Sequence, residues 1–170
     1  MLLSTACQEQ SSDLDDIVLQ CYDSKYQEAG YDIKSIIDEH EKSLIREGIL
    51  KDGSGKSYLE VLQKVNSDPD FRIEAPTFME KDPWHKVDKK TGVAVFDCEL
   101  EMIESLKEKD PRWQKVFSEP GSTENPDQMY QAIVETMTEE DLNSYHFRLK
   151  MFQVFDGVNS KWGNRSPDAN

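Results

Sequence analysis

Basic residues are scarce in this sequence of 170 residues, which has 20 Lys and Arg against 34 Asp and Glu and a formal net charge of −14. A chain with so much negative charge repels phosphate backbones, and this excludes nucleic-acid binding as a class of function. Long apolar runs are also lacking. Because a helix needs roughly 20 consecutive apolar residues to cross a bilayer, we predict no transmembrane helix.

Large apolar residues are few as well. Leu, Ile, Val and Phe together account for 38 of the 170 residues, about 22%. This length is typical of one domain that can bury a core of its own. We therefore expect a single acidic domain with a small core.

Motifs that carry chemistry are incomplete in this chain. The segment Gly53–Ser57 ends like a phosphate-binding loop, but Leu50 stands where that loop requires its first glycine. The histidines His40, His85 and His146 do not have the spacing of a zinc or di-iron site, and no Cys-x-x-Cys pair is present. We interpret His40, which lies on an apolar helix stripe, as a core residue. We predict no catalytic residue, metal or cofactor, and therefore a binding protein rather than an enzyme.

Apolar residues recur every three or four positions through most of the chain, and this spacing predicts amphipathic helices. Residues that begin or end helices stand between these stripes, such as Asp32 as an N-cap, Gly48 as a left-handed C-terminal residue, and Asp110 before a first-turn proline. The predicted helices cover about 13–28, 33–47, 58–67, 98–109, 111–117, 126–137 and 139–156. The fold class is therefore mostly α, a single-domain irregular bundle of six or seven helices.

Two pairs of residues have the spacing of a capping box. Ser57 and Glu60 predict a helix that begins near residue 58, and Thr138 and Asp141 predict the start of the last helix. We expect Gly157 to end this last helix. Its apolar surface is wider than one stripe, so we expect it to lie at the centre of the bundle.

Residues 71–96 are less regular and also allow a small β-hairpin. This region contains Lys81–Val87, a segment that resembles Lys109–Val116 in having Asp-Pro followed closely by Trp. We interpret both copies as the same helix start, with an Asp cap, a first-turn Pro and a Trp anchored on the core.

The first residues suggest where the protein is located. Ser4-Thr5-Ala6-Cys7 resembles the end of a bacterial lipoprotein signal peptide, and a polar stretch follows it. The resemblance implies that the Cys7 thiol carries a lipid. It also implies a signal remnant and flexible tether over 1–12. From the apolar spacing we expect a helical domain over 13–158, and the polar composition predicts a tail over 159–170.

With Cys7 lipidated, Cys21 and Cys98 form an even pair in a compartment where disulfides persist. They would then be able to form a disulfide across 77 residues of chain. By restricting the unfolded chain, such a bond would stabilise the fold by about 4 kcal/mol. The alternative is that both are free thiols acting as small apolar core residues.

Acidic residues are concentrated near the end of the chain, because no Lys or Arg occurs from 116 to 147. This block is either a face that attracts a basic partner or ordinary solubilising charge near helix starts. Its acids are Glu119, Glu124, Asp127, Glu135, Glu139, Glu140 and Asp141.

Together these patterns predict a non-enzymatic binding protein on the bacterial cell envelope, periplasmic or at the cell surface, held to the membrane through its lipid alone. A protein partner is favoured over a small ligand, and the sequence leaves the oligomeric state open. The alternative is an acidic cytoplasmic inhibitor or immunity-type protein that covers a basic partner surface with the acidic block.

Overall fold

The computed structural model describes residues 13–68, 70–118 and 126–162, and within these ranges all regular structure is helical. The predicted fold class, mostly α, is confirmed. The elements are α1 (Asp13–Ile17), the π-helix η1 (Val18–Asp23), α2 (Ser24–Glu28), α3 (Ile33–Arg46), α4 (Gly55–Ser67), the 3₁₀-helix η2 (Pro83–His85), α5 (Lys89–Lys109), α6 (Pro111–Ser118), α7 (Pro126–Thr136), α8 (Glu139–Leu142) and α9 (Tyr145–Trp162).

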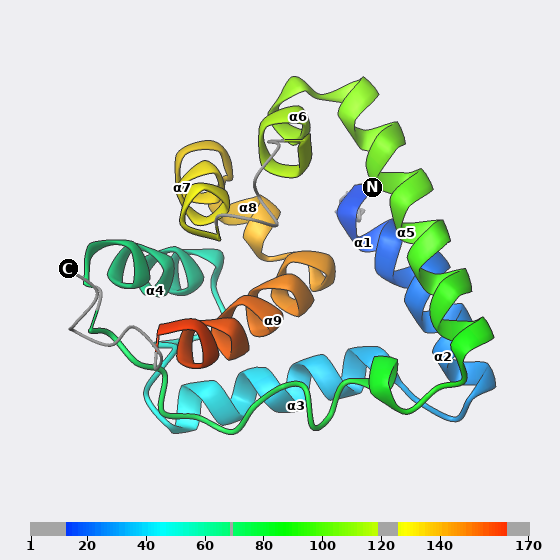
Figure 1. Cartoon of the computed structure of the whole chain (residues 1–170), viewed down its shortest axis with the longest axis horizontal. Coiled ribbons are helices and arrows are strands. Elements are labelled where there is room, and N and C mark those ends of the chain that lie inside the picture. Colours follow the sequence, from blue (N-terminus) through cyan, green and yellow to red (C-terminus); the bar gives the residue numbers. More distant parts are fainter. Residues whose placement is uncertain (1–12, 69, 119–125, 163–170) are drawn as a thin grey trace, which may run out of the picture.

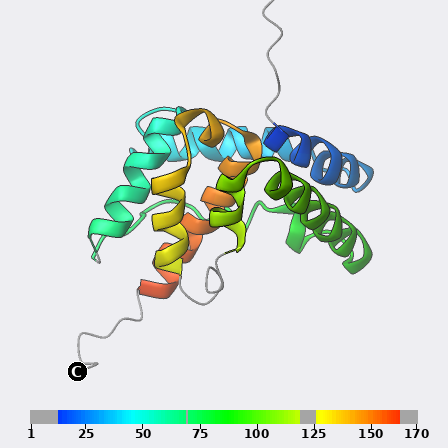
Figure 2. The ribbon, with the colours of Figure 1, turned by 90° about the horizontal axis from the view of Figure 1, so that it is seen from above.

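The helix α9 lies in the middle of the molecule, as predicted, and the other helices surround it (Figure 1). It packs against α3, α8 and α1, while α4 contacts α7 and α8. The long helix α5 runs beside α1, η1 and α2, and the two views show this pair of helical rods projecting from one side of the molecule (Figure 2).

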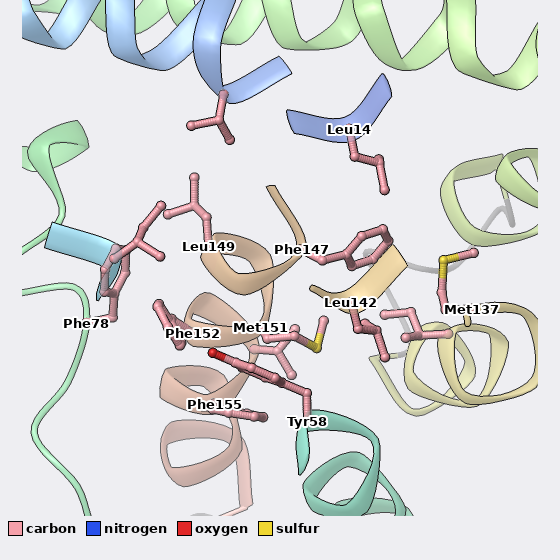
Figure 3. Close-up of a cluster of buried hydrophobic side chains, with 14 of the residues drawn as sticks. Leu14, Tyr58, Phe78, Met137, Leu142, Phe147, Leu149, Met151, Phe152 and Phe155 are labelled. Atoms are coloured by element: carbon pink, nitrogen blue, oxygen red, sulfur yellow. The ribbon is translucent and has the colours of Figure 1, made fainter. Parts of the chain in front are cut away.

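Aromatic side chains of α9 form much of the core. The rings of Phe152, Phe78 and His40 contact one another, and Phe155 stacks on Tyr58 with ring centroids 6.2 Å apart. Figure 3 shows Phe147 on another side of the same helix, turned toward α1. A helix with apolar side chains on several faces is stable only when other elements cover it, which explains its central position.

The first helical rod contains a π-turn where the sequence predicts one continuous helix over 13–28. Val18, Cys21 and Tyr22 are buried in this turn. Cys21 is bonded to a cysteine of α5, and the Tyr22 hydroxyl donates a hydrogen bond to the same helix. The turn therefore directs two consecutive side chains to one neighbour, and π-turns are often found at functional sites.

The start of α4 corrects one prediction, because the helix begins three residues before Tyr58. Ser54 is the N-cap, and the hydroxyl of Ser57 instead accepts hydrogen bonds from the backbone of the preceding loop. Gly55 permits this start, since a Cβ at this position would clash with the carbonyl oxygen of Glu139. Close contact with α8 thus decides where α4 begins.

The possible β-hairpin around 71–96 is not formed. Residues 71–82 contain no helix or strand, and residues 93–96 belong to α5. Val95, Ile103 and Leu106 form the buried stripe of this helix, together with an acid, Glu99. Leu100, one residue after Glu99, points away from that stripe and is 44% exposed.

The end of the chain differs from the predicted helix in two ways. The capping box of Thr138 and Asp141 is confirmed, but it opens the four-residue α8, and α9 starts separately at Tyr145. Gly157 does not end α9, which continues to Trp162 and thus into the predicted polar tail. No helix in the described ranges is both long and apolar enough to span a membrane.

Candidate binding site

A cavity of about 320 Å³ opens between the α1–α2 rod, residues 78–85, α5 and α9. We call it the Tyr26 cavity. Its volume lies at the lower end of the range of small-ligand sites in proteins. Aromatic rings make much of its wall: Tyr22, Tyr26, Phe78, Trp84 and Phe96.

Glu99 is a buried acid that lines this cavity and is 6% exposed. One carboxylate oxygen, Oε2, accepts a hydrogen bond of 2.6 Å from the Tyr22 hydroxyl. The other, Oε1, lies 2.6 Å from Lys150 Nζ and 2.9 Å from His146 Nε2. A buried carboxylate is stable only with partners of this kind, so the network fixes η1, α5 and α9 to one another.

The pKa shifts in the network agree with an ionised Glu99 and a neutral His146. Burial alone would raise the pKa of Glu99, but the His146 hydrogen bond and the Lys150 charge lower it to about 2. Burial lowers the pKa of His146, and the Lys150 charge acts in the same direction against the attraction of Glu99. We therefore assign the His146 proton to Nε2, which donates to the carboxylate.

A disulfide bond lies next to the Glu99 network. Cys21 and Cys98 form a disulfide with Cα atoms 5.5 Å apart. Each cysteine directly precedes a member of the network, Tyr22 on η1 and Glu99 on α5. The disulfide and the hydrogen bond therefore join the same two turns of helix and hold one wall of the Tyr26 cavity.

Two further acids line the cavity without a basic partner at hydrogen-bond distance in the described structure. Asp82 is 5% exposed; its Oδ1 accepts from the backbone N–H of Trp84, and its Oδ2 has a long contact of 3.4 Å with Gln153 Nε2. Asp156 accepts from two backbone N–H groups, of Phe78 and Met79. Burial raises the pKa of Asp156, and the negative charge of Asp82 raises it further.

The hydroxyl of Tyr26 stands out among the polar groups of the cavity. The residue is 0% exposed, and among the described residues its hydroxyl has no hydrogen-bond partner. Burial raises the pKa of Tyr26, as do the charges of Asp82 and Glu99. A buried hydroxyl without a partner costs about 1–3 kcal/mol, so this group is suited to a partner that the chain itself does not supply.

The mouth of the cavity carries exposed apolar side chains. Trp84 is 41% exposed and Phe96 is 48% exposed, and the indole of Trp84 lies over Gly92, one helical turn before Phe96. The prediction that both Asp-Pro-Trp segments anchor a Trp on the core holds for Trp113, which is 5% exposed, and is wrong for Trp84.

An apolar strip continues along α5 from the mouth. Val93 and Leu100 are 48% and 44% exposed and lie three and four residues from Phe96, on the same face of the helix. We call Val93, Phe96 and Leu100 the α5 strip. Contiguous apolar surface of this kind is often part of an interaction site.

The predicted acidic block is only partly described. Glu119 and Glu124 lie outside the described residues, and Asp127 lies in the first turn of α7. Two of its acids are paired with basic residues of α6, Glu135 with Lys115 Nζ at 2.7 Å and Asp141 with Arg112 Nη1 at 2.9 Å. Glu139 and Glu140 are exposed on α8. Basic residues outside the block therefore compensate part of its negative charge.

The remaining residues considered in the sequence analysis are His40, Cys7 and possible metal ligands. His40 is a core residue, as predicted: it is 1% exposed between Phe78 and Phe152, and burial lowers its pKa to about 4. Cys7 lies outside the described residues. In the described ranges, no group of three or more His, Cys, Asp or Glu could hold a metal ion.

Sequence reasoning missed the Glu99 network and the cavity. One signal was present, because Glu99 interrupts an apolar stripe at the spacing of Val95 and Ile103. Its partners on α9, however, give no such signal in the sequence.

The comparisons with known proteins give no relative for this arrangement: no family model, no curated protein and no solved structure matches the chain.

Proposed function

We propose that this chain is a non-enzymatic binding protein of the bacterial cell envelope, anchored by a lipid on Cys7, and that it binds its partner over the Tyr26 cavity and the α5 strip. The observation that carries the proposal is the exposure of Trp84 and Phe96 at the mouth of a cavity, in a domain with few large apolar residues. Aromatic side chains beside a pocket are the usual anchors of binding interfaces.

A protein is favoured over a small ligand as the main partner. The α5 strip extends along the helix from Phe96 to residues that do not line the cavity. A ligand that fits the cavity leaves this strip in water, whereas a protein surface covers both.

The cysteines support the envelope as the location. Disulfides persist in oxidising compartments and are rare in the cytoplasm, and Cys21 and Cys98 are bonded in this fold. The resemblance of Ser4–Cys7 to a lipoprotein signal adds an anchor in the same compartment. This combination favours the envelope over the alternative of a cytoplasmic inhibitor.

Site-specific cross-linking in living cells of the source organism tests the binding face. A photoreactive amino acid replaces Phe96 in one variant and Glu140, exposed on α8, in the control. We expect a discrete adduct from position 96 that disappears in the Leu100→Glu background, and no such adduct from position 140. Equal adducts from both positions, or none from position 96, contradict the proposal.

A further inference from the structure

We infer that the Tyr26 cavity binds an ammonium group, held between the Tyr26 hydroxyl and the Asp82 carboxylate, with the hydrocarbon part of the ligand between Trp84 and Phe96. The inference rests on the proposed function for the role of this face and adds the chemistry of what enters it.

The charge of the cavity favours a cation. The acids Asp82, Glu99 and Asp156 line it. The basic residues of the lining are Lys150, whose ammonium lies 2.6 Å from Glu99, and the exposed His85, which forms no ion pair with Asp82 or Asp156 in the described structure. Asp82 and Asp156 therefore remain as uncompensated negative charges in a partly enclosed space. A bound cation removes the repulsion between them, whereas an anion adds to it.

The hydrogen-bonding groups favour a donor such as an ammonium. Tyr26 has a buried hydroxyl without a partner among the described residues, and a phenol oxygen accepts a hydrogen bond. Asp82 Oδ2 has only the long contact from Gln153. One ammonium has three N–H groups, enough to serve both oxygens at once.

The walls of the cavity favour a cation attached to an apolar body. A cation near the face of an aromatic ring is attracted by the ring, most strongly by tryptophan. Trp84 and Phe96 also supply apolar surface for the carbon atoms that carry the ammonium. An inorganic cation has no carbon atoms to cover this apolar surface.

A free amine and a lysine side chain of a partner protein present the same chemistry. Three probes of the full chain therefore form the core of the test: 2-phenylethylammonium, its neutral analogue 2-phenylethanol and its anionic analogue 3-phenylpropionate. A blocked tripeptide with central lysine, compared with the same peptide carrying acetyl-lysine, tests the second source.

Binding is measured by titration calorimetry and by the NMR shift of the Trp84 indole N–H. We expect the ammonium to bind at least tenfold more tightly than either analogue. Tighter binding by the lysine peptide than by the free amine assigns the ligand to a partner chain, and the reverse order assigns it to a small molecule; both orders support the inference.

Two variants test the proposed contacts. Tyr26→Phe removes a hydroxyl that has no partner, so we expect affinity for the ammonium to fall about tenfold while thermal stability is unchanged or higher. Tyr58→Phe is the matched control, since its hydroxyl bonds to Glu41 outside the cavity lining. Asp82→Asn should weaken binding by more than tenfold, and Glu139→Gln, on α8, should leave it unchanged.

Equal affinity for all three phenyl probes, no shift at Trp84 with any amine, or full affinity in Tyr26→Phe overturns the inference. None of these results affects the cross-linking from Phe96, so failure of the inference is distinguishable from failure of the proposed function.

Discussion

Glu99 and Lys150 illustrate how single residues of this protein depend on their partners. The carboxylate is buried and ionised, and the lysine compensates its charge at 2.6 Å. Removing one member of a buried pair leaves the other uncompensated, which costs more than the pair contributes. The same two residues on the surface would contribute little.

We predict that Glu99→Gln lowers the free energy of unfolding by about 2–3 kcal/mol, less than for a fully enclosed pair because Lys150 can turn toward water. Urea denaturation measures the change. Glu101→Gln, an exposed acid on the same helix, is the control and should change stability by less than about 0.5 kcal/mol. Equal losses in both variants would show that Glu99 has no special role.

His40 predicts a pH dependence of stability. Its pKa is lowered by burial from 6.5 to about 4, so the unfolded chain binds the proton more tightly than the folded chain does. The stability due to neutral His40 is therefore complete above about pH 6.5 and is lost as the pH falls toward 4, by about 3 kcal/mol.

In His40→Leu, we expect unfolding measured between pH 7 and pH 4 to depend less on pH by about this amount. His85→Leu removes an exposed histidine and should retain the dependence of the original protein. A parallel pH curve for His40→Leu and the original protein contradicts this account of His40.

At the scale of elements, the disulfide holds the α1–α2 rod against α5. The two cysteines are 77 residues apart in the sequence, so the bond closes a long loop. We predict that Cys21→Ser with Cys98→Ser lowers the free energy of unfolding by about 4 kcal/mol through the greater freedom of the unfolded chain. Dithiothreitol should destabilise the original protein by a similar amount and leave the double variant unchanged. An original protein insensitive to dithiothreitol contradicts the prediction.

Alanine substitutions at two glycines are expected to change the stability in opposite directions, because one glycine lies at a helix contact and the other does not. Gly55→Ala places a Cβ against the carbonyl of Glu139 and forces α4 away from α8, so we expect a loss of at least about 2 kcal/mol in thermal or urea unfolding. Gly157→Ala meets no atom within 4 Å in the interior of α9 and should gain about 0.5–1 kcal/mol. The same sign of change in both variants would contradict this description of the contacts.

Elements of this fold are predictable where the signal is local. The Asp32 N-cap, the left-handed Gly48 and the start of α6 at Pro111 all follow from residues within one turn. Predictions fail where contact with a distant element determines a helix boundary. Helix α4, for example, begins at Gly55 because α8 packs closely against this position. Helix and strand were ambiguous for residues 93–96, because four apolar residues fit either period.

At the scale of the whole molecule, the site was not predictable, because it is assembled from parts far apart in sequence. Tyr26, Asp82 and Phe96 come from three segments, and only the folded chain brings them to one cavity. Trp84 and Trp113 follow the same local motif, yet the first lies at the cavity mouth and the second in the core. Their difference depends on which helices cover them.

The central claim, an envelope-anchored binding protein, is tested most directly by intact-mass spectrometry of the protein purified from native membranes. We predict a chain that begins at Cys7, carries a diacylglyceryl group and is two hydrogens lighter than its reduced form because Cys21 and Cys98 are bonded. A soluble chain that still begins at Met1 and carries three free thiols would contradict it.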